Sequence, residues 1–576
     1  MEETDLQLFS AYKVKPRNNS DTLSAYLIES TAPDNIDDNI NYYTSYDDSK
    51  YKDKLTQLKV DKNGALDEIV SALYDKLCNH DFSDQNYISN PDYGAPTLVI
   101  SVHGFNNPRD VILPGFWDSF VRVDKDEKIR NEDVVCIGYR WPSERMFSPL
   151  STLVSALPAL LGSVFVIGAV LLGSEWLFHE HGNITDNTTL YLTLLTSILL
   201  FIPVTLILLR AIVYFRDGYR ATAFGVPDLV EVIRQIDKRL NEELNKKFDN
   251  LNNIEDKQLK KNIQQLKQNI DDGKRRVRLS FIGHSMGAYV VTSVVRILSD
   301  VFDPATMREG LNNPNLPSQT QATNDPNAIA QEKLNLSKIG NVYRLARLIL
   351  ASPDIPAEAL AANRANFLSN ALTRFEEIYL FSNEGDEVLR LISTTVNYFS
   401  LPTKRKKFGY RLGNVCLSGR LWGVSHDIKW CDIKIGDMNL AELSTELNIK
   451  PGNDLPSKIS YFDCTDCVDG PDEGSMRGML TWAKRGKPMG RGYFNHLLLL
   501  FRYSFLPAEC PLRIDVHGGY FRSDFLSELI YRLACLGYEK MEAAYGGESQ
   551  LSEKCKEHQV KALLALQPKA SGAVSS

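Results

Sequence analysis

A serine flanked by two glycines is the first candidate for chemistry in this sequence. Residues 283–287 read Gly-His-Ser-Met-Gly, with Ser285 at the centre. Alternating apolar residues precede this pentapeptide and helix-spaced apolar residues follow it, so 277–298 predicts a strand, a tight turn and a helix. The glycines let strand and helix approach closely, which indicates a nucleophile elbow presenting the Ser285 hydroxyl. The Met286 N–H, at the start of the helix, is expected to stabilise a developing oxyanion.

A second stretch predicts the other half of an oxyanion hole. The apolar, β-branched run at 97–102 predicts a buried strand, and it leads directly into His103-Gly104-Phe105. The small glycine lets the loop fold beneath a substrate carbonyl, and the Phe105 N–H is the expected donor. A plain turn with a structural histidine is the alternative, but the serine motif downstream favours the functional interpretation.

Two aspartates are candidates for the acid of a catalytic triad. Asp354 follows the predicted strand 343–351, and Asp386 follows the predicted strand 377–381. In an open α/β sheet, functional side chains gather just beyond the carboxyl ends of the strands. Only one carboxylate is needed to orient and stabilise a catalytic imidazole. Asp386 is preferred because its loop opens a helix; Asp354 is the alternative acid, with capping of the following helix as its structural role.

The base should follow the last core strand, which is predicted over 458–463. His517 and His496 both satisfy this order, whereas His426 precedes the strand and ranks third. His496 leads into the run Leu-Leu-Leu-Leu-Phe, which is typical of a packed histidine. An imidazole in this position would accept the serine proton and return it to the leaving group.

Three motifs resemble those of one protein family. The chain reads Val-His-Gly-Phe-Asn-Asn at 102–107, Trp-Pro-Ser at 141–143 and Gly-His-Ser-Met-Gly at 283–287. Together they resemble a family of largely uncharacterised α/β-hydrolases with V-H-G-[YF]-N-N and W-P-S signatures. The resemblance implies that Asp386, in Asn-Glu-Gly-Asp-Glu-Val-Leu, is the acid. It implies also that His517, in His-Gly-Gly-Tyr-Phe, is the base.

Length, charge and cysteine content limit the kinds of protein that this chain can be. The chain has 576 residues, enough for two or three domains or for one large domain with insertions. Its net charge of -7 argues against a nucleic-acid partner. Nine scattered cysteines favour a reducing compartment over a disulfide framework. The pair Cys464-x-x-Cys467 lacks a second pair or a nearby histidine at zinc spacing, so neither a metal nor a cofactor is expected. The acidic N-terminus predicts no cleaved signal peptide.

Two uncharged stretches predict a transmembrane hairpin. Residues 150–174 and 187–209 contain no charged side chain, and each exceeds the roughly 20 residues that cross a bilayer. The link at 175–186 has no Lys or Arg, whereas arginines stand on both outer flanks of the hairpin. The positive-inside rule therefore predicts a two-pass integral membrane protein with its hydrolase domain facing the cytoplasm. An apolar lid over a soluble lipase site is the alternative.

The predicted fold class is α/β, with a mostly parallel sheet flanked by helices and interrupted by the hairpin. We expect an N-terminal extension over 1–90, a hydrolase core over 91–147, 217–300, 339–395 and 457–547, a transmembrane hairpin over 148–216, polar insertions over 301–338 and 396–456, and a tail over 548–576.

The order Ser285, Asp386, His517 is the order of an α/β-hydrolase triad. The sequence therefore predicts a serine esterase or lipase that meets lipid or other apolar acyl esters at the bilayer; a peptidase or thioesterase would use the same residues. The alternatives are a catalytically inactive membrane scaffold or signalling protein on a hydrolase fold, and an effector whose hairpin perturbs the membrane.

Overall fold

The structure is a computed structural model that describes residues 8–14, 23–32, 55–57, 64–78, 95–105, 107, 109–143, 214–249, 257–271, 275–302, 337–357, 372–393, 410–418, 422–426, 431–435, 438–442, 455–468 and 515–565. The predicted hairpin, except for residues 214–216, lies outside these ranges, and so does His496. None of the helices in the described ranges is both long and apolar enough to span a bilayer.

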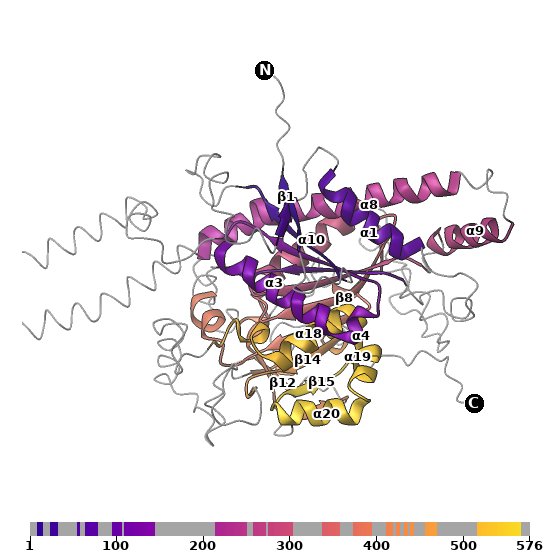
Figure 1. Ribbon diagram of the computed structural model, residues 1–576. Coiled ribbons are helices and arrows are strands. Elements are labelled where there is room, and N and C mark those ends of the chain that lie inside the picture. Colours follow the sequence, from indigo (N-terminus) through magenta and orange to yellow (C-terminus); the bar gives the residue numbers. More distant parts are fainter. Residues whose placement is uncertain are drawn as a thin grey trace, which may run out of the picture.

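A twelve-stranded sheet organises the fold (Figure 1). Its strand order is β11-β15-β14-β9-β8-β6-β4-β5-β2-β1-β3, and β7 pairs with β8. The strands are β1 (Phe9–Val14), β2 (Ser24–Ser30), β3 (Leu55–Gln57), β4 (Thr97–Val102), β5 (Val134–Arg140), β6 (Val277–His284), β7 (Lys338–Ile339), β8 (Tyr343–Ala351), β9 (Glu377–Ser382), β11 (Gly423–Ser425), β14 (Ile459–Asp463) and β15 (Lys561–Leu563). From β14 to β2 in this order, neighbouring strands are parallel. A smaller antiparallel sheet joins β10 (Val415–Leu417), β12 (Ile433–Ile435) and β13 (Met438–Asn439).

Helices cover both faces of the large sheet. They are α1 (Gly64–Cys78), α3 (Arg109–Lys125), α4 (Glu127–Arg130), α8 (Val226–Asp249), α9 (Lys257–Asp271), α10 (Met286–Phe302), α18 (Asp524–Leu536), α19 (Tyr538–Ala544) and α20 (Glu548–Glu557). The π-helical segments are η3 (Ala221–Gly225) and η5 (Val388–Ser393), and the 3₁₀ segments are η7 (Leu412–Asn414), η8 (Leu455–Lys458) and η9 (Gly519–Phe521).

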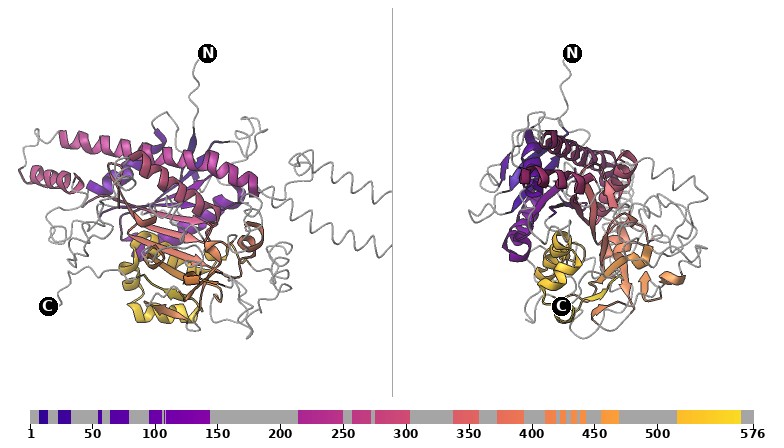
Figure 2. Two further views of the ribbon diagram at one scale, coloured as in Figure 1. Left: turned by 180° about the vertical axis from the view of Figure 1, so that it is seen from behind. Right: turned by 90° about the vertical axis from the view of Figure 1, so that its right-hand side faces the viewer.

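Two hydrophobic layers follow from the alternation of side chains along each strand. In β4, Leu98 and Ile100 pack in the layer that contains the apolar residues of α1, α8 and α10. Val99, between them, packs in the opposite layer with α3 and α18. Figure 1 shows α1 alongside α8 and α3 alongside α18, and the two views of Figure 2 show the sheet from other sides. Burial on both faces explains the continuous apolar runs of the central strands.

Parallel strands bring the ends of β4, β6, β8 and β9 to one edge. Gly283 in β6 pairs with Val102 in β4, and His284 pairs with Ala351 in β8. Ala351 in turn pairs with Phe381 in β9. The loops that follow these strands, which contain the predicted oxyanion loop, the serine and both aspartates, therefore begin side by side.

Two segments predicted as a tail and an insertion contain strands of the large sheet. Much of the tail expected after residue 548 forms α20 and β15, and β15 joins the large sheet between β14 and β11. The insertion expected over 396–456 contributes β11 to the same edge, paired in parallel with β15. These strands are three residues long, so their periodicity is too short to show in the sequence, and they depend on the neighbouring strand for their hydrogen bonds.

Candidate active site

The serine stands on a strained turn between β6 and α10. Ser285 has φ 54, in the left-handed region that non-glycine residues rarely adopt. The glycines around it leave no space for a side chain: a Cβ at Gly283 would lie 2.6 Å from the backbone of the first turn of α10. A Cβ at Gly287 would lie 2.4 and 2.5 Å from two carbonyl oxygens at the end of β4 and just beyond it. The close approach of strand, helix and neighbouring loop explains the glycines at both positions.

The loop after β4 lies directly against the serine. A Cβ at Gly104 would lie 2.8 Å from Cβ of Ser285. The next residue, Phe105, turns its ring towards His517, with 6.3 Å between the ring centroids. Met286 is the first residue of α10, where helix N–H groups have no intrahelical acceptor. The two predicted oxyanion donors, Phe105 and Met286, are therefore on segments that border Ser285.

His103 shapes this loop. Its Nδ1–H donates to the Gly104 carbonyl over 2.7 Å, and its own carbonyl accepts from the Trp141 indole N–H at 2.9 Å. The His103 and Trp141 rings stack with 5.0 Å between centroids. Burial lowers the pKa of His103 to about 3, so its imidazole stays neutral. This histidine holds the conformation of the loop after β4.

The Asn-Asn and Trp-Pro-Ser motifs meet in space. The Asn107 N–H donates to the Ser143 hydroxyl over 3.2 Å, and that hydroxyl donates to the Asp217 carboxylate over 2.9 Å. Asp217 belongs to the helical segment 214–220, which runs through η3 into α8. These contacts tie the loops after β4 and β5 to the segment that leads into α8.

His517 and Asp386 are hydrogen-bonded to each other. Nδ1 of His517 donates to Oδ2 of Asp386 over 2.7 Å, and both side chains are buried. The other Asp386 oxygen accepts from the N–H groups of Val388 and Leu389, at 3.1 and 3.2 Å. The Ser352 hydroxyl also donates to Oδ2 of Asp386. Three donors thus fix the carboxylate that orients the imidazole.

Carboxylates around the imidazole control its charge. Burial by itself would lower the pKa of His517, but the charge and hydrogen bond of Asp386, together with the charges of Asp515 and Asp354, raise this pKa above its ordinary value. This is the environment expected of a base that must hold a proton during a reaction.

The serine and the imidazole are both buried but do not bond each other. Within the described residues, neither Oγ of Ser285 nor Nε2 of His517 has a hydrogen-bond partner. Catalytic hydrogen bonds of this kind are often long in unliganded enzymes and tighten on substrate binding.

The alternative acid, Asp354, has other partners. Its carboxylate forms an ion pair with Arg411 at 3.2 Å and accepts from the Tyr214 hydroxyl at 2.6 Å. The Ser393 hydroxyl donates to it as well. Its backbone N–H donates to the Ser285 carbonyl over 3.1 Å. Asp354 therefore borders the elbow without bonding His517.

Three residues of the site had no role in the sequence-based prediction. His284 donates from Nε2 to the His517 carbonyl over 2.9 Å. Burial, and to a lesser extent the nearby His517, lowers the pKa of His284 to about 4, so His284 donates this bond as a neutral ring. Ser352 bonds Asp386, and Tyr214 bonds Asp354 while its ring meets Phe105 edge to face, with 5.7 Å between centroids. His284 lies inside the serine motif and Ser352 directly follows β8, so the position of each in the sequence could have indicated that it belongs to the site. Nothing in the sequence around Tyr214 indicates this.

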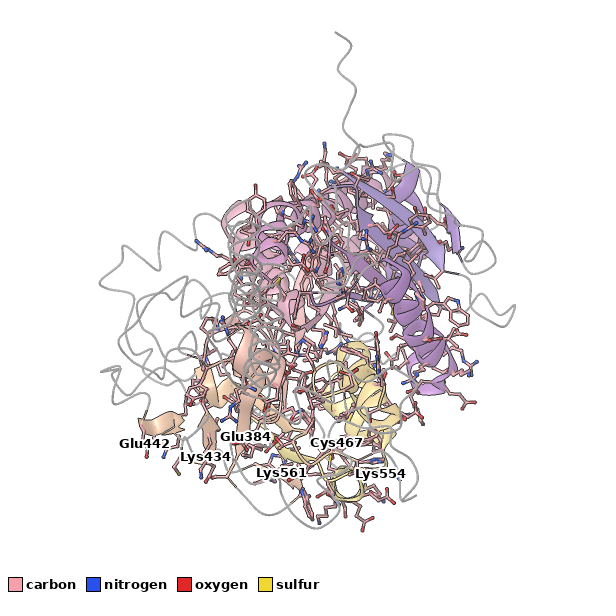
Figure 3. All side chains as sticks on the ribbon, turned by 90° about the vertical axis from the view of Figure 1, so that its left-hand side faces the viewer. Glu384, Lys434, Glu442, Cys467, Lys554 and Lys561 are labelled. Atoms are coloured by element: carbon pink, nitrogen blue, oxygen red, sulfur yellow. The ribbon has the colours of Figure 1, made fainter. Side chains whose placement is uncertain are left out.

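The remaining candidates lie elsewhere. His426 is half-buried, and its Nε2 is hydrogen-bonded to Oε1 of Glu548 at 2.9 Å. Cys464 and Cys467 are buried beyond the end of β14, and Figure 3 labels Cys467 in the part of the molecule that carries Lys554 of α20 and Lys561 of β15. The described residues contain no group of three or more side chains suited to hold a metal ion.

Comparison with known proteins identifies the class. Residues 240–399 match the model of a family described as an α/β hydrolase of unknown function, DUF900. The match includes Ser285, Asp354 and Asp386, whereas Phe105 and His517 lie outside it. No curated protein and no solved structure matches the chain. The mostly parallel sheet flanked by helices agrees with this match, and together they support an α/β-hydrolase domain and, with it, a hydrolase.

Proposed function

We propose that this hydrolase is a serine esterase that uses Ser285 as nucleophile, His517 as base and Asp386 as the acid that orients the base. The observation that carries the proposal is the hydrogen bond of 2.7 Å between His517 and Asp386 beside a serine at φ 54. A strained serine next to a buried, carboxylate-bound imidazole is the arrangement that acyl transfer requires.

The reaction would proceed in two halves. Nε2 of His517 takes the hydroxyl proton as Oγ of Ser285 bonds to the carbonyl carbon, and the N–H groups of Phe105 and Met286 donate to the oxygen that becomes negative. The carbon–oxygen bond to the alcohol then breaks, and Nε2 returns its proton to the departing alkoxide. Water, deprotonated by the same nitrogen, attacks the acyl carbon; the bond from this carbon to Oγ of Ser285 then breaks, and Nε2 returns the proton to Oγ as the acid leaves.

The substrate class follows from the predicted membrane hairpin. Two uncharged stretches, 150–174 and 187–209, are each long enough to cross a bilayer, and they interrupt the chain between two parts of the hydrolase domain. We propose that they anchor the protein in a membrane with the hydrolase domain on the cytoplasmic side. An esterase held there meets lipid or other apolar acyl esters, and the proposed chemistry needs no cofactor.

Labelling by a fluorophosphonate tests the catalytic part, because the reagent requires only an activated serine. Membrane fractions carrying the wild type, Ser285→Ala and His517→Ala would be compared. We expect the wild type to be labelled and both variants to lose labelling. A folded wild type that stays unlabelled would refute the proposal and favour an inactive scaffold on a hydrolase fold.

A further inference from the structure

Aromatic side chains cluster on the exposed side of the segment that leads into α8. Six large hydrophobic residues in the described ranges are exposed, and three of them lie close together: Phe215 at 46%, Tyr219 at 58% and Tyr289 at 37%. The first two share one face of the helical segment 214–220, four residues apart. Tyr289 comes from α10, and its hydroxyl lies 3.4 Å from that of Thr222 in η3. These residues form one aromatic surface: Phe215, Tyr219 and Tyr289.

The charged residues of the same segment face inwards. The Asp217 side chain is fully buried, and it pairs with Arg216 at 3.3 Å and Arg220 at 3.8 Å. The side chains of these arginines are only 22% and 3% exposed. A helix on a water-exposed surface normally buries its apolar side and exposes its charges. This segment has the reverse arrangement, which suits an apolar environment on its outer side.

The aromatic surface lies next to the candidate active site. Tyr214, at the start of the segment, packs against Phe105 of the oxyanion loop. A Cβ at Gly218 would lie 4.0 Å from the methyl group of Met286, the residue after the serine. The segment therefore packs against Phe105 and passes close to Met286 on one side, while its other side presents aromatic rings.

The position along the chain points to the environment. Residue 214 follows the 23 uncharged residues of 187–209 after only four others, so these aromatics stand where interfacial residues flank a membrane-spanning stretch. Tyrosine favours this position because its ring is apolar and its hydroxyl is polar. We infer that the surface of Phe215, Tyr219 and Tyr289 lies in the interfacial layer of a lipid bilayer and brings the opening of the active site to that layer, so that the acyl chain of the substrate enters from the bilayer. This inference rests on the proposed esterase function and on the proposed anchor.

Two fluorophosphonates of different chain length test the inference on the full-length protein in phosphatidylcholine vesicles. A hexadecyl probe partitions into the bilayer, and a short-chain probe stays in water. The double variant Phe215→Ser/Tyr219→Ser should be labelled about tenfold more slowly by the hexadecyl probe, since it loses two apolar anchors, while its labelling by the short-chain probe stays within about twofold of the wild type. Trp422→Ser is the matched control, because Trp422 is an exposed aromatic residue at 39% that directly precedes β11, the strand at one edge of the sheet. It should leave both rates unchanged.

Equal slowing of both probes would show that the aromatic residues support the fold or the catalysis, and unchanged rates would show that they have no part in delivering lipid. Either result overturns the inference. If the wild type is a dimer and Phe215→Ser/Tyr219→Ser is a monomer, while the ratio of the two labelling rates is unchanged, the surface binds a second copy of the chain. This result also overturns the inference.

A readout that does not depend on catalysis separates this inference from the proposed function. A fluorophore attached to Tyr219→Cys should be quenched by nitroxide-labelled lipids, and the same fluorophore on Trp422→Cys should not. If the wild type reacts with neither fluorophosphonate, the esterase proposal fails, whereas the absence of quenching at residue 219 contradicts the position of the surface in the bilayer.

Discussion

The two aspartates at the carboxyl edge of the sheet should respond to the same substitution in opposite ways. Asp386→Asn replaces the carboxylate that holds the His517 imidazole at 2.7 Å. Loss of this orientation and of the charge that stabilises the imidazolium lowers kcat by about 10⁴ in triads of this kind, or about 5 kcal/mol of transition-state stabilisation. The variant should keep most of its stability, because an amide of the same shape fills the site.

Asp354→Asn should have the reverse effect. It leaves the bond between His517 and Asp386 intact but removes the partner of the Arg411 guanidinium, which is paired at 3.2 Å with both side chains almost fully buried. Removing one partner of a buried ion pair costs about 3–5 kcal/mol of folding free energy. The labelling rate of the folded protein should stay within about tenfold of the wild type, since Asp354 contacts the elbow through its backbone.

Both quantities can be measured on the same preparations. The second-order rate constant for fluorophosphonate labelling reports the activation of Ser285, and urea unfolding at a fixed detergent concentration reports stability. Labelling of the folded Asp354→Asn protein that is as slow as that of Asp386→Asn would refute this assignment of the two carboxylates. So would a loss of several kcal/mol of stability in Asp386→Asn alone.

Three further predictions concern the same site. Asp386, Asp515 and Asp354 together raise the pKa of His517 above the ordinary 6.5 against the effect of burial, and only the neutral imidazole accepts a proton. The labelling rate should therefore rise with pH through a midpoint above 6.5, and a midpoint at or below that value contradicts this prediction. Gly287→Ala places a Cβ 2.4 Å from a backbone carbonyl, so it should destabilise the protein by about 1–3 kcal/mol in urea unfolding and slow labelling, whereas a neutral outcome would mean that the turn is loosely packed. Tyr214→Phe keeps the ring against Phe105 but removes one donor to a buried carboxylate, so it should cost about 1–3 kcal/mol of stability and slow labelling less than Tyr214→Ala does.

The strands and the helix that hold the site can be predicted from the sequence, because their patterns of apolar residues are long and local. The strand predicted over 97–102 is β4, and the strand predicted over 343–351 is β8. A continuous apolar run between turn residues is a strong signal for a strand covered on both faces. The helix after the serine follows equally from the spacing of its apolar residues. Local periodicity thus places the serine and both aspartates at one edge of the sheet.

The parts that sequence did not predict depend on contacts between distant residues. β15 has three residues, and its hydrogen bonds to β14 and β11 come from segments about 100 and 140 positions earlier in the chain. The Tyr214 hydroxyl meets a carboxylate 140 residues away. Contacts of this kind produce no periodic pattern in either segment, so they cannot be predicted from the sequence and are seen only in the folded structure.

The choice between Asp354 and Asp386 shows why strand position alone is insufficient. Both follow adjacent parallel strands that end in register, with Ala351 opposite Phe381, so order and topology treat them alike. Their partners differ in charge. The Arg411 guanidinium already balances the Asp354 carboxylate, and a carboxylate in an ion pair has less of its field left for a second cation. Among the described residues, the donors that hydrogen-bond to the Asp386 carboxylate, apart from His517, are two amides and a hydroxyl, all neutral, so its negative charge remains to stabilise an imidazolium. Asp386 has neutral donors, whereas Asp354 has a buried arginine, and this physical difference favours Asp386 as the proposed acid.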